Sequence, residues 1–415
     1  MPPRKVTQAP SLPARRGKVK LALMTTPAAA EPRIPYAPTL LALEVSRAQV
    51  IRRAVEILFG LAHSPGYAAL VDPGADEVSL RAPGSFGVFM GYDFHITPEG
   101  PKLVEINTNA GGALLNGLLS LRRCDPGSIP WICCPPPAPE AVERRLVETF
   151  RAEFEAVRGP EAELASVAIV DDGPSGQFLY PEFLLFVELF RRHGIEATIA
   201  DTRDLEYVPG EGVRAEGRRV DLVYLRDTDF SLSEERSASL RRAYLAGEVV
   251  VTPTPREHHL LADKRRLAVF SDPEALRTLG LPAEDAAFLA RIVPRTVPLD
   301  RLSFEEAWRT RRRWVFKPAR LFGSKAVYRG DKISRRRLEE LYRSPEGFVA
   351  QELVDPGSVE VETPEGLRRM KFDVRAYVYR DEILLFGARV YEGQVTNFRT
   401  PGGGFSAICL AKEAS

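Results

Sequence analysis

Between residues 39 and 63, apolar side chains recur every three to four positions. Residues at this spacing return to the same face of an α-helix, so the segment is predicted to be an amphipathic helix whose apolar face packs on the core. The positions that carry this pattern are Leu43, Val50, Ile51, Val55, Leu58 and Leu61.

Two short β-strands are predicted after this helix, at residues 87–94 and 102–106. Thr-Pro-Glu-Gly at 97–100 has the composition of a turn that joins them. Five prolines then fall between positions 130 and 139, and such a stretch is typical of an extended linker. We therefore place a boundary there.

Beyond residue 139 the pattern changes to strands that alternate with helices. This alternation predicts a parallel sheet, whose ligands bind at the carboxyl ends of the strands. Asp171, Asp172, Arg226 and Asp229 fall at such ends. The predicted strands are 166–171, 195–200, 220–225 and 249–252, and the predicted helices are 139–157, 178–193 and 233–246.

The last third of the chain is predicted to hold short helices and one apolar strand, 314–317, followed mostly by strands from 347 to 410. Gly402, Gly403 and Gly404 form a glycine loop near the carboxyl end. Together these patterns assign the chain to the α/β (α+β) class.

The composition is that of an ordinary globular protein, with 44% hydrophobic and 27% charged residues, and 415 residues suffice for several domains. The net charge of +1 lacks the basic excess of a dedicated nucleic-acid binder, and no apolar run reaches the length of a membrane span. The arginine-rich runs 309–313 and 335–337 fit solvated helix faces. We therefore expect neither nucleic acid nor a membrane as a partner.

Residues 1–38 are rich in proline and basic side chains and lack a long apolar stretch. They are predicted to form a flexible basic tail of a cytoplasmic protein. The four cysteines are too few and too irregularly spaced for a disulfide framework, and we expect ordinary buried thiols.

Phosphate-loop, dinucleotide-binding, nucleophile-elbow and zinc-protease motifs are absent from the sequence. The sharpest chemical signal is that Asp93 ends the first predicted strand while Glu105 and Asn107 lie two apart on the next, facing the same side. Hard oxygen donors on neighbouring strands suit Mg²⁺ and leave room for phosphate oxygens. The pattern alone is equally consistent with carboxylates that are structural.

Two further segments hold residues suited to phosphate. Lys317 closes an apolar strand and Lys325 lies in the loop that follows, which can place an ammonium on a phosphate. Asp373 and Arg375 share a strand face and Arg389 lies on the next strand, so two arginines can clamp phosphoryl oxygens. Taken singly, each segment also fits a solvated strand end or face.

Together these segments resemble the ATP-grasp superfamily. Its members typically end in D-x(11–12)-E-x-N, whose side chains hold magnesium, and Asp93, Glu105 and Asn107 match that pattern. A D-[IV]-R motif, a further arginine and Thr-Asn with a glycine loop normally precede it, but here they follow it. The chain therefore resembles a circularly permuted ATP-grasp protein, as in eukaryotic-type glutathione synthetases. The residues that match the second part are Asp373, Val374, Arg375, Arg389, Thr396, Asn397 and Gly402, Gly403 and Gly404.

The resemblance implies roles for individual residues. Lys264 and Lys317 resemble the two phosphate-binding lysines of the family, and residues 351–354 resemble its adenine-binding hinge. Loop 319–327 would be the lid loop, although Gly323 is its only glycine. The implied ATP-binding residues are Lys264, Lys317, Lys325, Gln351, Glu352, Leu353, Val354, Asp373 and Asn397, and the predicted substrate-side residues are Arg226, Asp229 and Gly403.

The implied activity is that of an ATP-dependent ligase that joins a small-molecule carboxylate to an amine through an acyl phosphate. Two Mg²⁺ ions on Asp93, Glu105 and Asn107 would neutralise charge, and Arg375 and Arg389 would be catalytic. Two alternatives stay open, namely an ATP-grasp kinase of a small molecule and a non-catalytic ATP-binding module. Many relatives form homodimers, but nothing in the sequence marks an interface.

The predicted domain organisation follows the permuted order. The parts are the basic tail at 1–38, the permuted C-terminal part of the ATP-grasp domain with its metal site at 39–128, a proline-rich linker and helix at 129–158, a Rossmann-like parallel-sheet substrate domain at 159–258, a small lid at 259–346, and the core strands with the glycine loop at 347–415.

Overall fold

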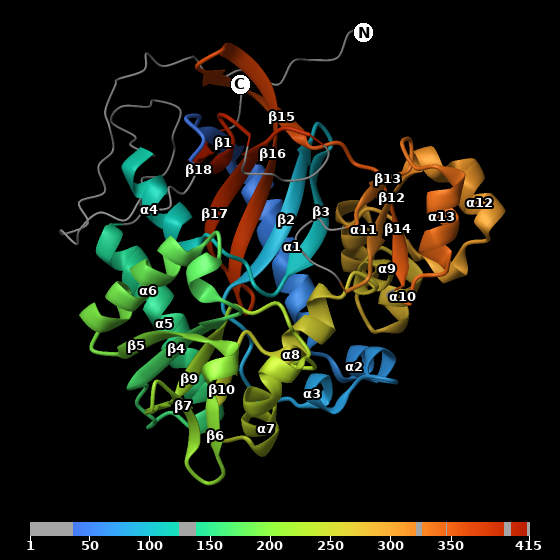
Figure 1. Ribbon diagram of the computed structural model, residues 1–415. Helices are drawn as coiled ribbons and strands as arrows, with labels where there is room; N and C mark the ends of the chain where they lie inside the picture. Colours follow the sequence, from blue (N-terminus) through green and yellow to red (C-terminus); the bar gives the residue numbers. More distant parts are fainter. Residues whose placement is uncertain (1–35, 124–137, 321–325, 346, 394–399, 413–415) are drawn as a thin grey trace.

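The computed structural model describes residues 36–123, 138–320, 326–345, 347–393 and 400–412. They form a mixed α/β fold with a large, mostly antiparallel sheet, a parallel sheet and two smaller antiparallel sheets (Figure 1). The predicted α/β class is confirmed at this level. Most of the predicted basic tail, the proline-rich linker, Lys325, Thr396 and Asn397 lie outside the described residues.

The large sheet is built from both ends of the chain. Its strands lie in the order β1, β18, β17, β16, β2, β3, and β15 also pairs with β16. Strands from the first quarter of the chain therefore lie beside strands from the last, as Figure 1 shows. The bounds are β1 Leu41–Glu44, β2 Met90–Thr97, β3 Gly100–Asn107, β15 Gly357–Thr363, β16 Gly366–Tyr379, β17 Glu382–Tyr391 and β18 Gly404–Ala411.

Helix α1 (Val45–Ala62) packs on this sheet, and Ile51, Val55 and Leu58 are fully buried in the shared core. The predicted helix began at residue 39, but residues 41–44 form β1 instead. Leu41 and Leu43 alternate into the core, and this strand pairs in parallel with β18, which is far away in the sequence.

The parallel sheet has the strand order β10, β9, β4, β5. Its apolar strands are covered by helices, and Pro181 lies in the first turn of α6, as predicted. The bounds are β4 Ser166–Asp171, β5 Glu196–Asp201, β9 Leu222–Leu225, β10 Val250–Thr252, α5 Pro139–Arg158, α6 Tyr180–Arg192 and α7 Ala238–Ala246, with a small sheet of β6 Glu206–Val208, β7 Gly212–Ala215 and β8 Arg218–Val220.

The third sheet, which we call the lid sheet, has the order β11, β14, β12, β13 and its own apolar core around Phe316 and Leu338. Short helices surround it, and others connect it to the rest of the chain. The bounds are β11 Thr296–Pro298, β12 Trp314–Pro318, β13 Tyr328–Arg329, β14 Phe348–Glu352, α9 Arg266–Phe270, α10 Pro273–Thr278, α11 Ala283–Ile292, α12 Phe304–Thr310 and α13 Arg335–Tyr342.

The remaining helices are short connections, except for α4. They are α2 Pro65–Val71, α3 Glu77–Leu80, α4 Ala113–Arg123 on the large sheet, and α8 Pro255–Glu257, which continues into a π-helical turn at His258–Ala262. Among the described residues no single helix has the length and apolar character to cross a membrane; the bent pair α1 and α2 passes that test only when taken together.

Two predicted elements were displaced. The strand predicted at 87–94 is β2, which begins at Met90 and continues to Thr97, so Asp93 lies within the strand rather than at its end. The helix predicted at 233–246 begins only at Ala238, after a 3₁₀ turn at Glu235–Ser237.

One prediction about the cysteines was wrong. Cys409 is buried in β18 and is disulfide-bonded rather than a thiol. The other three cysteines lie outside the described residues.

Candidate active site

Strand register aligns the predicted residues of four strands on one face of the large sheet. Asp93 on β2 lies opposite Glu105 on β3 and opposite Arg375 on β16. Asp373, two residues before Arg375, lies opposite Arg389 on β17. Directly opposed residues, and residues two apart on a strand, point to the same face. Five charged side chains that are distant in sequence therefore meet there.

Asp93 is the centre of this cluster. Arg375 donates to both of its carboxylate oxygens, Nε to Oδ1 at 2.6 Å and Nη2 to Oδ2 at 2.7 Å. Arg389 and Asn107 also donate to Oδ2, at 2.7 and 3.0 Å. Burial by itself would raise the pKa of Asp93, but the two arginine charges outweigh it and lower the pKa below its ordinary value.

Asp373 completes this arrangement, because it accepts a hydrogen bond of 2.7 Å from Nε of Arg389. Arg389 thus bridges two buried carboxylates, with one nitrogen on each. Bidentate and bridging contacts hold a guanidinium in one orientation, so the two arginines and the two carboxylates form one fixed cluster of compensated charge at this face.

Glu105 has a different partner. The ammonium of Lys264 lies 2.9 Å from Oε1 of Glu105, and Lys264 is almost fully buried. Burial favours a higher pKa for Glu105, but the charges of Lys264 and Lys317 outweigh it and lower the pKa. Glu105 is therefore a carboxylate at neutral pH, and 27% of its side chain remains exposed.

Lys317 on β12 reaches from the lid sheet to the large sheet. Its ammonium donates to the carbonyl of Val104 at 3.0 Å and to Oε1 of Gln351 at 2.7 Å. Gln351 was predicted to lie in the adenine-binding hinge, and here its side chain holds this lysine. Lys317 is thus fixed between the two sheets.

Burial lowers the pKa of Lys317 to about 8 from its ordinary 10.5. Between these values the unfolded chain binds more protons than the folded chain, so this group adds stability as the pH rises through that window. We predict that the melting temperature of the wild type rises, relative to that of Lys317→Met, between pH 8 and 10. Lys332→Met, at an exposed lysine, is the control. Parallel curves for wild type and Lys317→Met would contradict the prediction.

A cavity of about 120 Å³, which we call the central cavity, lies between the large sheet and the lid sheet. One part of its wall is cationic, and another is apolar, formed by side chains such as Val315, Val327 and Pro356. The predicted residues that line it are Asp93, Glu105, Lys264, Lys317, Gln351, Glu352, Leu353, Val354, Asp373 and Arg389.

The predicted hinge at the end of β14 is held by backbone contacts. The N–H groups of Glu352 and Leu353 donate to the carbonyls of Arg295 and Arg313, both at 2.7 Å. The carbonyl of Val354 accepts a hydrogen bond of 2.9 Å from Nδ1 of His95. The first two contacts tie the hinge to the residues just before β11 and β12, and the third ties it to β2 of the large sheet.

Several residues of the central cavity were missed by the sequence reasoning. His95 lies two residues after Asp93 on the same face of β2, and burial lowers its pKa, so the ring is neutral at pH 7. Lys371 lies two residues before Asp373, and Arg329 comes from β13. The two-residue spacing from Asp93 and from Asp373 could have placed His95 and Lys371 on the face of the cavity, whereas no pattern in the sequence indicated Arg329.

On the substrate side, Arg226 at the end of β9 contacts the loop that follows β3. Its Nη1 donates to the side-chain oxygen of Asn109 and, at 3.2 Å, to the hydroxyl of Tyr224. Burial raises the pKa of the neighbouring Asp171 to about 6, against the opposing charge of Arg226. The carboxyl edge of the parallel sheet is thus joined to the strand that bears Glu105 and Asn107.

Two other predicted substrate residues lie elsewhere. The carboxylate of Asp229 accepts hydrogen bonds from the N–H groups of Ser233 and Glu234, each at 2.9 Å, so both oxygens close its own loop. Gly403 donates from its N–H to Thr400 at 2.9 Å, next to β18. Neither contact points to a substrate.

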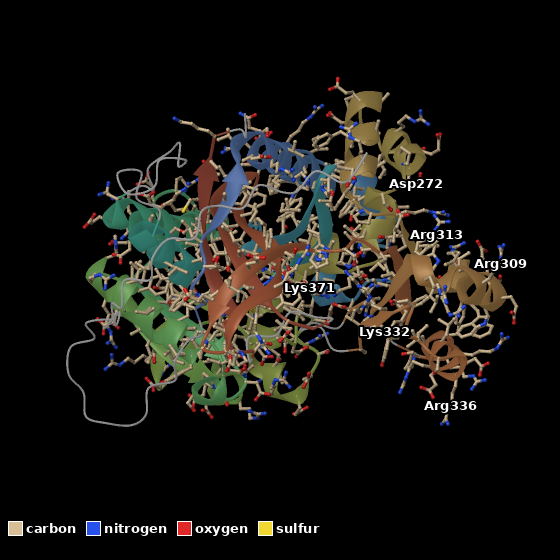
Figure 2. All side chains as sticks on the ribbon, turned by 90° about the horizontal axis from the view of Figure 1, so that it is seen from above. Asp272, Arg309, Arg313, Lys332, Arg336 and Lys371 are labelled. Carbon is tan, nitrogen blue, oxygen red and sulfur yellow. The ribbon has the colours of Figure 1, made fainter. Side chains whose placement is uncertain are left out.

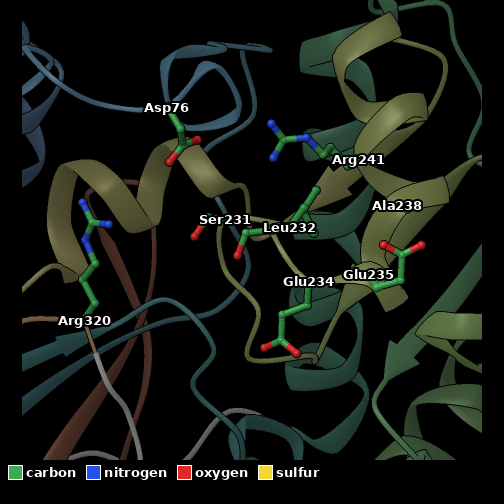
Figure 3. Close-up of a pocket in the computed structure, with 9 residues that line it drawn as sticks. Asp76, Ser231, Leu232, Glu234, Glu235, Ala238, Arg241 and Arg320 are labelled. Atoms are coloured by element: carbon green, nitrogen blue, oxygen red, sulfur yellow. The ribbon is translucent and has the colours of Figure 1, made fainter. Parts of the chain in front are cut away.

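A larger open cavity of about 600 Å³ lies beside the parallel sheet. This second cavity is lined by the loop that begins α7, by Asp76 and Arg241, and by Arg320 from the segment after β12 (Figure 3). Its side chains include three acids and two arginines. Arg320 lies 3.6 Å from Asp263, the neighbour of Lys264, so this cavity adjoins the segment that carries a central-cavity lysine.

The arginine runs of the lid sheet contribute no side chain to the lining of either cavity. Arg309 and Arg336 point outward from α12 and α13 (Figure 2), whereas Arg313, in the turn before β12, lies 3.7 Å from Glu352. Several of their neighbours form ion pairs on that surface, such as Arg335 with Glu305 at 2.5 Å. The arrangement matches the solvated helix faces expected from the sequence.

Neither the protein-family models nor the curated proteins compared with this chain include a match. Among solved structures, the chain is similar to a glutathione synthetase-like effector from Globodera pallida in its apo form. The two share 11% identity with a TM-score of 0.58, over 91% of this chain and 90% of that one. The chain has a glutathione synthetase-like fold.

This fold extends over nearly the whole length of both chains, so the resemblance predicted from the sequence is confirmed for the fold. Two weaker similarities are to a putative gamma-glutamylcysteine synthetase from Methylobacillus flagellatus KT and to the D-cycloserine synthetase DcsG. The first has a TM-score of 0.45 and 10% identity, over 89% of this chain and 88% of that one. The second has a TM-score of 0.29 and 15% identity, over 60% of this chain and 92% of that one. At these scores they add no argument about the site.

Proposed function

We propose that this chain is a circularly permuted ATP-grasp ligase, which uses Mg²⁺ and ATP to join a small-molecule carboxylate to an amine through an acyl phosphate. The observation that carries the proposal is the central cavity. There, carboxylates and Arg389 of the large sheet face Lys264, which comes before the lid sheet in the chain, and Lys317 on β12 of the lid sheet.

The two halves of this cavity suit the two halves of a nucleotide. Five basic side chains line it together with four carboxylates, and the basic ones can pair with the phosphates of a nucleotide while the carboxylates face its metal. The basic side chains are Lys264, Lys317, Arg329, Lys371 and Arg389. The apolar part of the wall, formed by side chains such as Val315, Val327 and Pro356, suits a flat base, and Glu352 at the end of β14 can accept from a ribose hydroxyl.

The donor set fits Mg²⁺ through Glu105 and Asn107, which offer hard oxygens from one strand face. Both oxygens of Asp93 already accept hydrogen bonds from arginines. Asp93 could therefore bind the metal as well only if Arg389 turned away from it towards a phosphate. No group of three or more His, Cys, Asp and Glu side chains in the described ranges is arranged to hold a metal by itself. Glu105 and Asn107 would hold the metal together with the phosphates of the nucleotide. When bound, the ions neutralise phosphate charge.

In the first step, an oxygen of the substrate carboxylate attacks the γ-phosphorus, the bond to the β-phosphate oxygen breaks, and ADP leaves. The protein supplies position and charge rather than a nucleophile. Lys264 and Lys317 hold the phosphates and Arg389 stabilises the transferred group, while Arg375 holds the Asp93 carboxylate that Arg389 also contacts. Water must be excluded because acyl phosphates hydrolyse, and closure of the lid sheet on the large sheet would do this.

In the second step, an amine nitrogen attacks the acyl carbon, phosphate leaves, and the nitrogen loses its proton. The parallel sheet would be the substrate domain, since its carboxyl edge at Asp171 and Arg226 adjoins the loop after β3. The second cavity, with its acids, suits the incoming amine, which is protonated at neutral pH. A kinase would transfer the γ-phosphoryl group to its acceptor and stop there. It would release no free phosphate, which distinguishes it from a ligase.

The first test is the melting temperature with and without Mg·ATP. Ligand at about a hundred times its dissociation constant stabilises the folded chain by roughly 2.7 kcal/mol, which is a rise on the order of 5–10 °C. We expect this rise in the wild type to require Mg²⁺ and to shrink in Asn107→Ala. An unchanged wild-type melting temperature at millimolar Mg·ATP would contradict the proposal. Where the rise is found, ADP and phosphate released with an acid-plus-amine panel separate ligase, kinase and binding module.

A further inference from the structure

His258 connects three parts of the molecule that are distant in sequence. Its ring stacks on Phe230, with centroids 4.1 Å apart and planes inclined by 10°. Its Nδ1 shares a hydrogen bond of 2.8 Å with the hydroxyl of Thr108, which directly follows β3. Its backbone opens the π-helical turn that leads to Lys264.

Each of these neighbours belongs to part of the proposed reaction site. Thr108 is buried and follows Asn107, so it fixes the end of the proposed metal strand. Lys264 is paired with Glu105 on that same strand. Phe230 precedes Ser231 and Leu232, which line the second cavity.

The His258 ring is suited to hold such parts together without adding a charge. Burial lowers its pKa to about 3, so the imidazole is neutral over the physiological range and its bond to Thr108 joins two neutral groups. Single π-helical turns are rare and are frequently found at functional sites. Here the turn sets the position from which Lys264 reaches Glu105.

We infer that His258 is a positioning residue, which through Thr108 and Phe230 holds Lys264, the Glu105–Asn107 strand and the loop of the second cavity in one fixed relation. The inference rests on the proposed function, because it concerns how the parts of that site are held in fixed positions relative to one another. It predicts that losing the His258–Thr108 bond weakens the binding of Mg·ATP more than the binding of ATP without metal.

The experiment is calorimetric titration of the full chain with ATP, with and without Mg²⁺. His258→Phe keeps an aromatic ring to stack on Phe230 but removes the hydrogen bond, and Thr108→Val removes the same bond from the other side. Each is expected to weaken Mg·ATP binding about tenfold, as changes to residues behind metal ligands do. The double variant is expected to lose no more than either single variant, because both remove one interaction.

Conservative variants and a control separate this role from a general structural one. Thr108→Ser and His258→Asn keep a hydrogen-bonding group and are expected to stay within about threefold of the wild type. His193→Phe, at the end of α6, is expected to change nothing. Additive losses in the double variant, or wild-type Mg·ATP affinity in Thr108→Val, would overturn the inference.

The result also separates this inference from the proposed function. A wild type that does not bind Mg·ATP overturns the proposed function itself, and the inference with it. A wild type that binds Mg·ATP, with variants that bind it equally well, overturns only the role of His258. If His258→Phe does not fold, the comparison of Thr108→Val with Thr108→Ser decides.

Discussion

Glu105→Gln is expected to abolish the effect of Mg²⁺ on ATP binding while the chain remains folded. Glu105 is the carboxylate of the cluster that no arginine holds, and 27% of its side chain is exposed, so it is the best placed to meet a metal. The amide keeps the shape of the side chain but loses the charge. Because a metal contributes several kcal/mol of charge stabilisation, we expect Mg·ATP binding to weaken by at least about a hundredfold and ADP release to fall further.

The matched control is Glu382→Gln, a solvent-exposed glutamate at the start of β17 whose partner is Arg145. It is expected to bind Mg·ATP as the wild type does. Circular dichroism and the melting temperature without ligand verify that both variants fold. If Glu105→Gln bound Mg·ATP with wild-type affinity, Glu105 would not be a metal ligand and its pairing with Lys264 would be structural.

The elements with the clearest hydrophobic period were predicted well. Helix α6 and strand β4 lie within two residues of their predicted bounds, since each buries side chains at a regular spacing. β1 was wrongly predicted to be helical, because its four residues, LALE, are too few to distinguish the helical period from the two-residue period of a strand. Its strand conformation is imposed by pairing with β18, which joins Leu41 to Ile408, and such a distant partner leaves no local signal.

The candidate site likewise contains residues that could be grouped from local spacing and residues that could not. Asp93, Glu105 and Asn107 could be grouped from the sequence because a single hairpin carries them, and the two-residue spacing puts Glu105 and Asn107 on one face. The observed strand register then places Asp93 opposite Glu105. The clamp on Asp93 could not be derived from local pattern, since Arg375 comes from a strand 282 residues further along the chain. It was anticipated only through the family resemblance, which grouped Arg375 and Arg389 with the metal residues.

Roles within the site were harder to predict than membership in it. Residues 351–354 were predicted to form a hinge that contacts adenine through its backbone, and the structure adds a contact that the sequence did not indicate, in which the side chain of Gln351 accepts from Lys317 at 2.7 Å. Asp229 at a strand end looked available to a substrate, but it closes its own loop. Which of several nearby donors a polar side chain meets depends on tertiary packing, and spacing along the chain does not encode it.

The second large effect is expected from Asp93→Leu, on stability. Asp93 is 1% exposed, and its removal leaves Arg375, itself 9% exposed at the side chain, without the carboxylate that it contacts through two nitrogens. Breaking a buried ion pair from one side costs about 3–5 kcal/mol, so the melting temperature is expected to fall on the order of 10 °C. Because the pKa of Asp93 is lowered in the folded chain, this contribution is present at neutral pH and is lost on acidification below about pH 4.

The double variant Asp93→Leu with Arg375→Met separates stability from function. Replacing both members of a buried pair by apolar side chains is often nearly neutral, because no charge is left uncompensated. We therefore expect the double variant to regain most of the lost melting temperature, since Arg389 keeps its bond to Asp373. It should nevertheless fail to bind Mg·ATP in calorimetry. A double variant that regained both stability and Mg·ATP binding would show that the clamp serves only the fold, whereas regained stability alone would assign the Asp93–Arg375 pair to the site.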